Sequence, residues 1–253
     1  MGCYIEQRAE RVAWSYPWVH NARFSSNGKM IVSCSSDKTI RLWDVNSGAS
    51  LKVLRGHFQG VSNAEFSSDD TIIVSSSFDT TILLWDVNSG KMIKKLGECP
   101  FPIHDVQFSP DGKYIVSSDD KTIVIWDMES GQKIHKLENY SNAVLKSKFS
   151  PDGKFVISSF RNCVIQIWNI KTKTDLKKLE GHIDTVRDLQ YLPDGHTIVS
   201  CSNDMTIRLW DMKSGHEIQK LEGHSGNVSG IGISPDGRII ASASLDKTIK
   251  LWG

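Results

Sequence analysis

The sequence has no excess of either charge, no long apolar run and no Cys-x-x-Cys pair, and each absence excludes a class of protein. Lys and Arg number 30 against 29 Asp and Glu, for a formal net charge of +1, whereas proteins that bind nucleic acid usually carry a clustered basic surface. No stretch approaches the roughly 18 apolar residues that cross a membrane, and the first residues lack the apolar core of a signal peptide. We therefore expect no nucleic-acid partner and no membrane insertion.

Cysteine is sparse, and its spacing suggests no pairing. The five cysteines are Cys3, Cys34, Cys99, Cys163 and Cys201. An odd, scattered set is typical of reduced thiols and not of a disulfide framework. The expected location is the cytoplasm, with the nucleus as an alternative.

One short signature recurs six times, and each copy ends in tryptophan. These tryptophans are Trp43, Trp85, Trp126, Trp168, Trp210 and Trp252, at successive spacings of 42, 41, 42, 42 and 42 residues. A period this regular indicates one supersecondary unit repeated along the chain. Because the units account for the whole length, we expect a single repeat domain over residues 1–253, with units ending near these tryptophans.

Residues 57–90 illustrate how one unit is built. Segment 61–66 alternates between apolar and polar residues, 71–77 is rich in β-branched residues, and 81–85 is apolar at nearly every position. After an Asn-Ser-Gly turn, segment 91–96 is more polar. Four short antiparallel strands per unit form one blade, and blades must stack on each other to bury both faces.

These repeats resemble the WD-repeat β-propeller family over essentially the entire chain. The resemblance implies a buried hydrogen-bonded set of His, Ser, Asp and Trp in each complete repeat, since a buried indole N–H and a buried imidazole both need partners. The complete sets are His57, Ser75, Asp79 and Trp85; His182, Ser200, Asp204 and Trp210; and His224, Ser242, Asp246 and Trp252.

Three repeats depart from the family pattern at the His position. The first, third and fourth repeats carry Ser15, Cys99 and Tyr140 there. The third repeat is also one residue shorter before Asp120, which aligns with the turn Asp of the family. We expect these three blades to be held less by the polar set and more by packing, so that local opening begins in them.

The predicted fold is all-β: a closed β-propeller of six four-stranded antiparallel blades. The last repeat stops at Gly253, after its third strand, and the first repeat is preceded by a surplus segment. The resemblance implies that the N-terminal segment, roughly residues 4–12, completes the last blade beside 249–252 and so leaves no unpaired edge at the seam. A fragment of a seven-bladed propeller is the alternative, because seven blades are the commoner count in the family that these repeats resemble. Segment 6–11 is also polar and a poor strand by propensity.

The residues most suggestive of function lie on loops at one face of the expected propeller. The resemblance marks loop positions of each repeat, where large apolar and Arg side chains stand among otherwise polar turns, and such side chains are enriched at protein interfaces. The candidate partner-binding residues are Trp18, His20, Phe78, His104, Leu145, Arg161, Arg187 and Leu245. The predicted function is a non-catalytic scaffold that binds a peptide or protein on this face, within a multiprotein complex.

Other functions have weaker support. A Ser-His-Asp grouping resembles a hydrolase triad, but its repetition argues against three identical active sites. His20 and His104 occupy matching positions, yet no carboxylate or Cys spacing supports a metal site, so neither metal nor cofactor is expected. An enzyme, or a propeller that binds nucleic acid or phospholipid through its channel or rim, is the alternative. The repeats do not identify the partner, since fold alone does not specify function.

Overall fold

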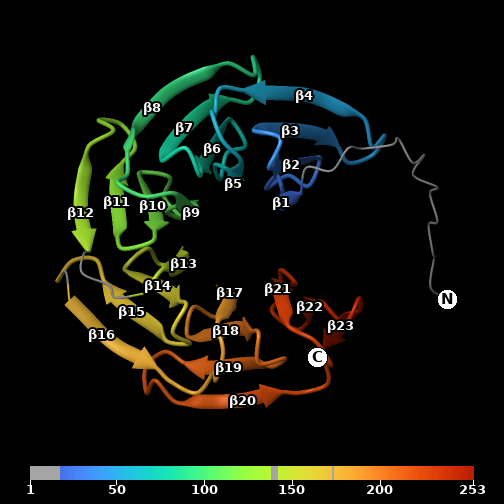
Figure 1. Ribbon diagram of the computed structural model, residues 1–253, viewed down its shortest axis with the longest axis vertical. Helices are drawn as coiled ribbons and strands as arrows, with labels where there is room; N and C mark the ends of the chain where they lie inside the picture. The colour runs from blue at the N-terminus through green and yellow to red at the C-terminus, as the bar shows by residue number, and fades with distance from the viewer. Residues whose placement is uncertain (1–17, 138–141, 173) are drawn as a thin grey trace.

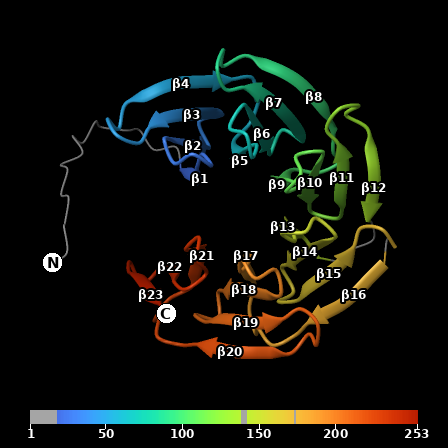
Figure 2. The same cartoon turned by 180° about the vertical axis from the view of Figure 1, so that it is seen from behind.

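The computed structural model describes residues 18–137, 142–172 and 174–253 as six antiparallel sheets arranged radially around a central axis (Figure 1 and, from behind, Figure 2). Five sheets have four strands, and the sheet β21-β22-β23 has three among the described residues. The six-bladed all-β propeller is therefore confirmed. The predicted completion of the last blade by residues 4–12 lies outside the described residues.

The strands follow each other in chain order, from the inner edge of each blade to its outer edge. Blades 1 and 2 comprise β1 Val19–Phe24, β2 Met30–Ser35, β3 Thr39–Asp44, β4 Ser50–Arg55, β5 Val61–Phe66, β6 Ile72–Ser77, β7 Thr81–Asp86 and β8 Met92–Glu98. Blades 3 and 4 comprise β9 Ile103–Phe108, β10 Tyr114–Asp119, β11 Ile123–Asp127, β12 Lys133–Leu137, β13 Val144–Phe149, β14 Phe155–Phe160, β15 Ile165–Asn169 and β16 Thr174–Leu179. Blades 5 and 6 comprise β17 Val186–Tyr191, β18 Thr197–Ser202, β19 Ile207–Asp211, β20 Glu217–Leu221, β21 Val228–Ile233, β22 Ile240–Ser244 and β23 Ile249–Trp252.

In blades 3, 4 and 6 the turn between the first two strands is built by the Ser-Pro-Asp-Gly sequence itself. In blade 3 the Ser109 hydroxyl donates to Asp111 at 2.6 Å and accepts the Tyr114 N–H at 2.9 Å. Gly112 has φ of 69°, a left-handed conformation that favours glycine. These local bonds fix the hairpin register and leave the strands to bury their faces against the neighbouring blades.

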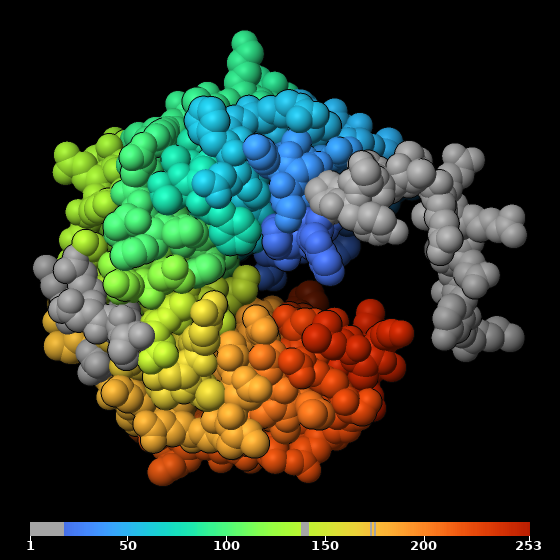
Figure 3. Space-filling view, in the orientation of Figure 1, coloured from blue at the N-terminus to red at the C-terminus, as the bar shows by residue number. Residues whose placement is uncertain are grey.

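The hydrophobic core is divided among the five junctions between consecutive blades. At the first junction Val32 and Ile40 of blade 1 pack with Val61, Ile73 and Trp85 of blade 2. The next four junctions repeat this arrangement. Between the described parts of blades 1 and 6, by contrast, the ring is open, and the space-filling view shows a notch between the blue and red ends (Figure 3).

Candidate functional site

A linear hydrogen-bonded chain runs through blade 2. Trp85 Nε1–H donates to Ser75 Oγ at 2.8 Å, and His57 Nε2 lies 2.8 Å from the same oxygen. His57 Nδ1 lies 3.0 Å from the Asp79 carboxylate, which also accepts the Thr81 hydroxyl at 2.6 Å. Because a carboxylate only accepts, Nδ1 carries the proton and Nε2 accepts from Ser75. The order of donation is therefore Trp, Ser, His, Asp.

Blades 5 and 6 repeat this geometry. In blade 5 the His–Asp, His–Ser and Trp–Ser distances are each 2.8 Å, in the set His182, Ser200, Asp204 and Trp210. In blade 6 the same three distances are 2.7, 2.7 and 2.9 Å, in the set His224, Ser242, Asp246 and Trp252. The structure thus brings together all twelve residues of the three predicted sets. Each Ser is buried, and its hydroxyl is engaged inside its own blade, so the sets stabilise blades and present no nucleophile to solvent.

The electrostatics of the set match a structural role. Burial lowers the pKa of His57, and the Asp79 carboxylate only partly offsets this. Burial also acts to raise the pKa of Asp79, but hydrogen bonds from Thr81 and from the Phe58 N–H outweigh it and the pKa falls. A neutral imidazole against a charged carboxylate is the stable combination in this environment.

Blades 1 and 3 keep the Trp–Ser bond without a described histidine. The bonds from Trp43 to Ser33 and from Trp126 to Ser117 measure 2.8 and 2.9 Å. In blade 3 the thiol of Cys99 takes the position of the imidazole and hydrogen-bonds Ser117, and burial raises its pKa to about 11. Positions 15 and 140, the other two substituted histidine positions, lie outside the described residues.

The turn of blade 3 differs from the sequence alignment. Asp119, and not Asp120, performs the turn function: its carboxylate accepts the Thr122 N–H and the Thr122 hydroxyl, each at 2.8 Å, and it is buried. Asp120 instead pairs with His104 at 2.8 Å on the loop face. The missing residue before Asp120 shortens the turn, so Asp119 takes the turn position that the alignment gives to Asp120.

We define the loop face as one edge of the ring, where two kinds of loop meet in each blade. One is the connection that precedes the inner strand, which is β1, β5, β9, β13, β17 or β21, and the other is the turn between the second and third strands of the blade. Backbone bonds tie the two loops of a blade together, as in Phe78 N–H to Gly60 O at 3.0 Å. On this face His20, Phe78 and His104, from blades 1, 2 and 3, form an aromatic row with centroid distances of 5.5 and 6.4 Å. Phe78 lies between the two histidines, whose Nε2 atoms bond Ser36 and Asp120, so the rings form an aromatic strip and no paired metal ligands.

The other five predicted partner-binding residues lie on blades 1, 4, 5 and 6. Trp18 and Leu245 are largely exposed, Leu145 is half-buried, and the Arg187 Nε–H donates to Asn203 at 2.8 Å. The Arg161 side chain is exposed on blade 4. The structure therefore clusters only His20, Phe78 and His104, and spreads the other five around the face.

Two exposed apolar residues of this face were not predicted. Phe58 and Ile183 directly follow the network histidines of blades 2 and 5, and are 81% and 85% exposed. Their N–H groups donate to the network carboxylates of Asp79 and Asp204 at 2.7 and 3.2 Å. The sequence signal was an apolar residue immediately after Gly-His, where the third complete set has Ser225.

Comparison with protein-family models supports the same repeat division. The model for the WD domain, G-beta repeat matches residues 13–44, 48–86, 90–127, 131–169, 173–211 and 215–253. The chain belongs to the WD-repeat family. WD-repeat propellers generally act as protein-interaction scaffolds and typically bind other proteins, and they are typically non-enzymatic.

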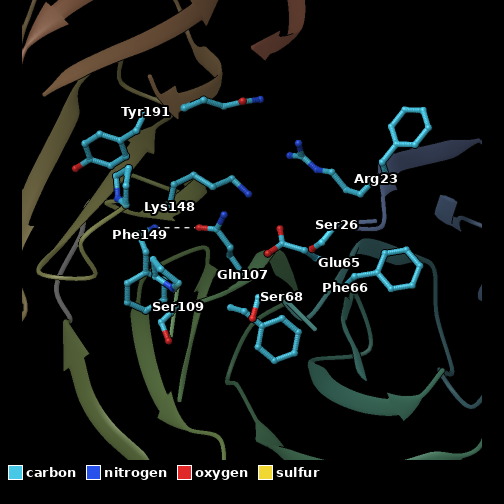
Figure 4. A pocket seen from close by; sticks show the side chains of 15 residues that line it. Arg23, Ser26, Glu65, Phe66, Ser68, Gln107, Ser109, Lys148, Phe149 and Tyr191 are labelled. Carbon is cyan, nitrogen blue, oxygen red and sulfur yellow. Dashed lines mark hydrogen bonds between the residues drawn. The ribbon is translucent and has the colours of Figure 1, made fainter. Parts of the chain in front are cut away.

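The central channel of this WD-repeat propeller is polar and electrically balanced. At the end opposite the loop face, Arg23, Glu65, Gln107 and Lys148 project from the inner strands into a cavity of about 450 Å³ (Figure 4). Burial raises the pKa of Glu65. Burial also acts to raise the pKa of Asp105, but the Lys146 and Lys148 ammonium groups outweigh it and hold that pKa low.

Neither a metal cluster nor a membrane-spanning helix is present in the described part of the WD-repeat chain. No group of three His, Cys, Asp or Glu side chains there is arranged to hold a metal ion. Among the same residues, no helix is long and apolar enough to cross a membrane.

Proposed function

We propose that this WD-repeat propeller is a non-catalytic scaffold that binds a peptide or protein segment on its loop face. The observation that carries the proposal is the aromatic strip of His20, Phe78 and His104, on the same face as the exposed side chains of Phe58 and Trp18. Clustered aromatic groups on an exposed surface are characteristic of protein interfaces, where they bury large areas at low entropic cost.

The charges of this face favour a partner segment that combines apolar and acidic residues. Arg161 and Arg187 are exposed on blades 4 and 5, where they can form bidentate pairs with carboxylates. Burial and the nearby Lys146 lower the pKa of His20, so its ring stays neutral at physiological pH and contributes apolar surface. The proposed partner therefore places an apolar side chain over Phe78 and an acidic one near the arginines.

The test compares partners captured by two triple variants of the tagged protein. One variant carries Trp18→Ala, Phe58→Ala and Ile183→Ala on the loop face. The matched control carries Leu51→Ala, Met92→Ala and Ile218→Ala, three exposed side chains on the outer strands β4, β8 and β20. Because all six side chains are exposed, both variants should keep the melting temperature of the parent protein.

We expect the loop-face variant to lose at least five-fold in the recovery of specific partners by quantitative mass spectrometry, while the control retains them. Equal recovery with the two variants would show that the loop face is not the binding surface. Loss with the control alone would assign binding to the outer rim.

We also propose that the protein acts inside the cell, in a reducing compartment. The four described cysteines, Cys34, Cys99, Cys163 and Cys201, are free thiols, and three of them are buried. Imaging of a fluorescent fusion tests this, and secretion of the fusion would contradict it.

A further inference from the structure

The channel end opposite the loop face carries one polar side chain from the inner strand of each of five blades. These side chains follow each other along the sequence at spacings of 42, 42, 41 and 42 residues, so they occupy the same register position: Arg23, Glu65, Gln107, Lys148 and Gln190. All five line the cavity of about 450 Å³ shown in Figure 4. Among the described residues, blade 6 contributes none of the lining, so the cavity does not depend on the opening between blades 1 and 6.

The next ring of the channel, two residues earlier in each strand, bonds within itself. Asn63 Nδ2 donates to the Asp105 carboxylate, and Lys146 Nζ donates to the same carboxylate at 3.3 Å. Asp105 also accepts the Ser147 N–H at 3.1 Å. This ring therefore joins blades 2, 3 and 4 through its own side chains.

Two cations of the cavity ring lack such partners. Lys148 is 3% exposed, and its Nζ has no hydrogen-bond partner among the described residues. The Asp105 carboxylate lies 3.5 Å from this Nζ and already accepts three other donors. The buried Nε of Arg23 also has no partner in the described part of the chain. A buried donor without an acceptor is destabilising, so both groups call for an acceptor from outside the protein.

The side chains of the cavity ring converge on one space. Arg23 of blade 1 and Lys148 of blade 4 point toward each other across the cavity in Figure 4. Gln107 Oε1 accepts the Phe149 N–H at 2.9 Å, so its Nε2 donors face the same space. Burial raises the pKa of Glu65 and favours its neutral form, which also donates. The cavity thus offers donors from four blades and two positive charges.

We propose that this end of the channel binds a phosphate group, either as free orthophosphate or as part of a small organic molecule. Phosphate has three strong acceptor oxygens that point in different directions, so one group can accept donors from opposite sides of the ring. Arg and Lys are the usual cationic partners of phosphate. A carboxylate presents only two oxygens in one plane and suits donors on one side. The cavity volume lies within the range of small-ligand sites, about 300–1,000 Å³.

The experiment titrates the full chain with orthophosphate and with glycerol 2-phosphate by isothermal titration calorimetry. We expect one binding site per chain for at least one of the two probes. Similar affinity for both probes assigns the site to the phosphate group alone, and tighter binding of glycerol 2-phosphate assigns it to an organic phosphate. The loop face lies at the other end of the channel, so this test is independent of the proposed function.

The cations are tested with matched variants. Arg23→Gln with Lys148→Gln should lower the affinity at least ten-fold, because both charges that face the cavity are lost. The control, Arg55→Gln with Lys178→Gln, removes the same two charges from exposed positions of β4 and β16 and should leave the affinity unchanged. Arg23→Gln alone should lower it at least three-fold, and this variant serves if the double variant melts below the parent protein.

A substitution inside the cavity separates charge recognition from disturbance of the channel. Glu65→Gln keeps a donor and adds no charge, so it should bind the probes at least as tightly as the parent protein.

Three results would overturn the inference. The first is no saturable binding of either probe at millimolar concentration. The second is a loss of affinity with Glu65→Gln, or with the control pair, as large as the loss with the cavity pair. The third is tighter binding of acetate than of either phosphate probe, since this would assign the cavity to carboxylates.

Discussion

Blades 2 and 6 carry the same polar set at the same positions but differ in what surrounds it. In both blades the Trp–Ser–His–Asp chain has bonds of 2.7 to 3.0 Å. Blade 2 packs on both faces, and Ile82 is fully buried, whereas its counterpart Ile249 in blade 6 is 74% exposed. The polar set is therefore a property of one blade, while the burial of its apolar residues depends on two neighbours.

The largest expected difference between the two blades comes from truncating this isoleucine. Ile82→Ala should destabilise the protein by about 2–5 kcal/mol, because it leaves a cavity in a packed junction. Ile249→Ala should change the free energy of unfolding by no more than about 0.5 kcal/mol, because the side chain already meets solvent. Denaturant unfolding of both variants checks this, and equal losses would show that blade 6 is packed on both faces in solution.

Removal of the shared serine should affect the two blades alike. Ser75→Ala and Ser242→Ala each leave an indole N–H and a buried imidazole nitrogen without their common partner, at a cost of about 1–3 kcal/mol. The Trp85 indole is buried, and the Trp252 indole is partly buried. The same unfolding measurement applies. A cost in blade 6 of less than half that in blade 2 would mean that the set depends on the neighbouring blade.

Hydrogen exchange separates the effect of the polar set from the effect of packing. The sequence predicts that blades 1, 3 and 4 open first, because their histidine position is substituted. The exposed face of blade 6 predicts instead that β23 opens first. We expect amides of β23 to exchange at least ten-fold faster than those of β7, with β15 of blade 4 protected like β7 because both its faces are packed. Faster exchange in β15 than in β23 would show that the polar set dominates.

The smallest expected effect is a dependence of stability on pH through His57. Its pKa is lowered in the native blade from the ordinary value of 6.5. At a pH between the lowered pKa of the native blade and 6.5, the unfolded chain binds a proton that the native blade does not. The contribution of His57 to stability is therefore full above about pH 6.5 and declines as the pH falls. Unfolding at pH 7.5 and 5.5 should show a smaller acid loss for His57→Gln than for the parent protein, and an identical loss would contradict this origin.

The sequence predicted the local features well, because strands, turns and the His, Ser, Asp and Trp sets follow from residues within one period. It placed His20, Phe78 and His104 on one face for the same reason. The turn role of Asp119 was missed, since a one-residue deletion can be absorbed on either side of the turn. The exposure of Ile249 could not be read from its repeat, because the same apolar pattern is buried wherever a neighbouring blade is present.

Three inner-strand acceptors bond backbone of the following blade, whereas Asp70 of blade 2 accepts the Ser26 and Asn27 N–H groups of the blade before it. Asp105, Gln107 and Asp188 each accept from backbone that follows them by 42 or 43 residues. During synthesis, each of these three acceptors therefore leaves the ribosome before the backbone group that it binds. At these two junctions the acceptors are in place for a blade that is synthesised later, the order in which chains fold during translation.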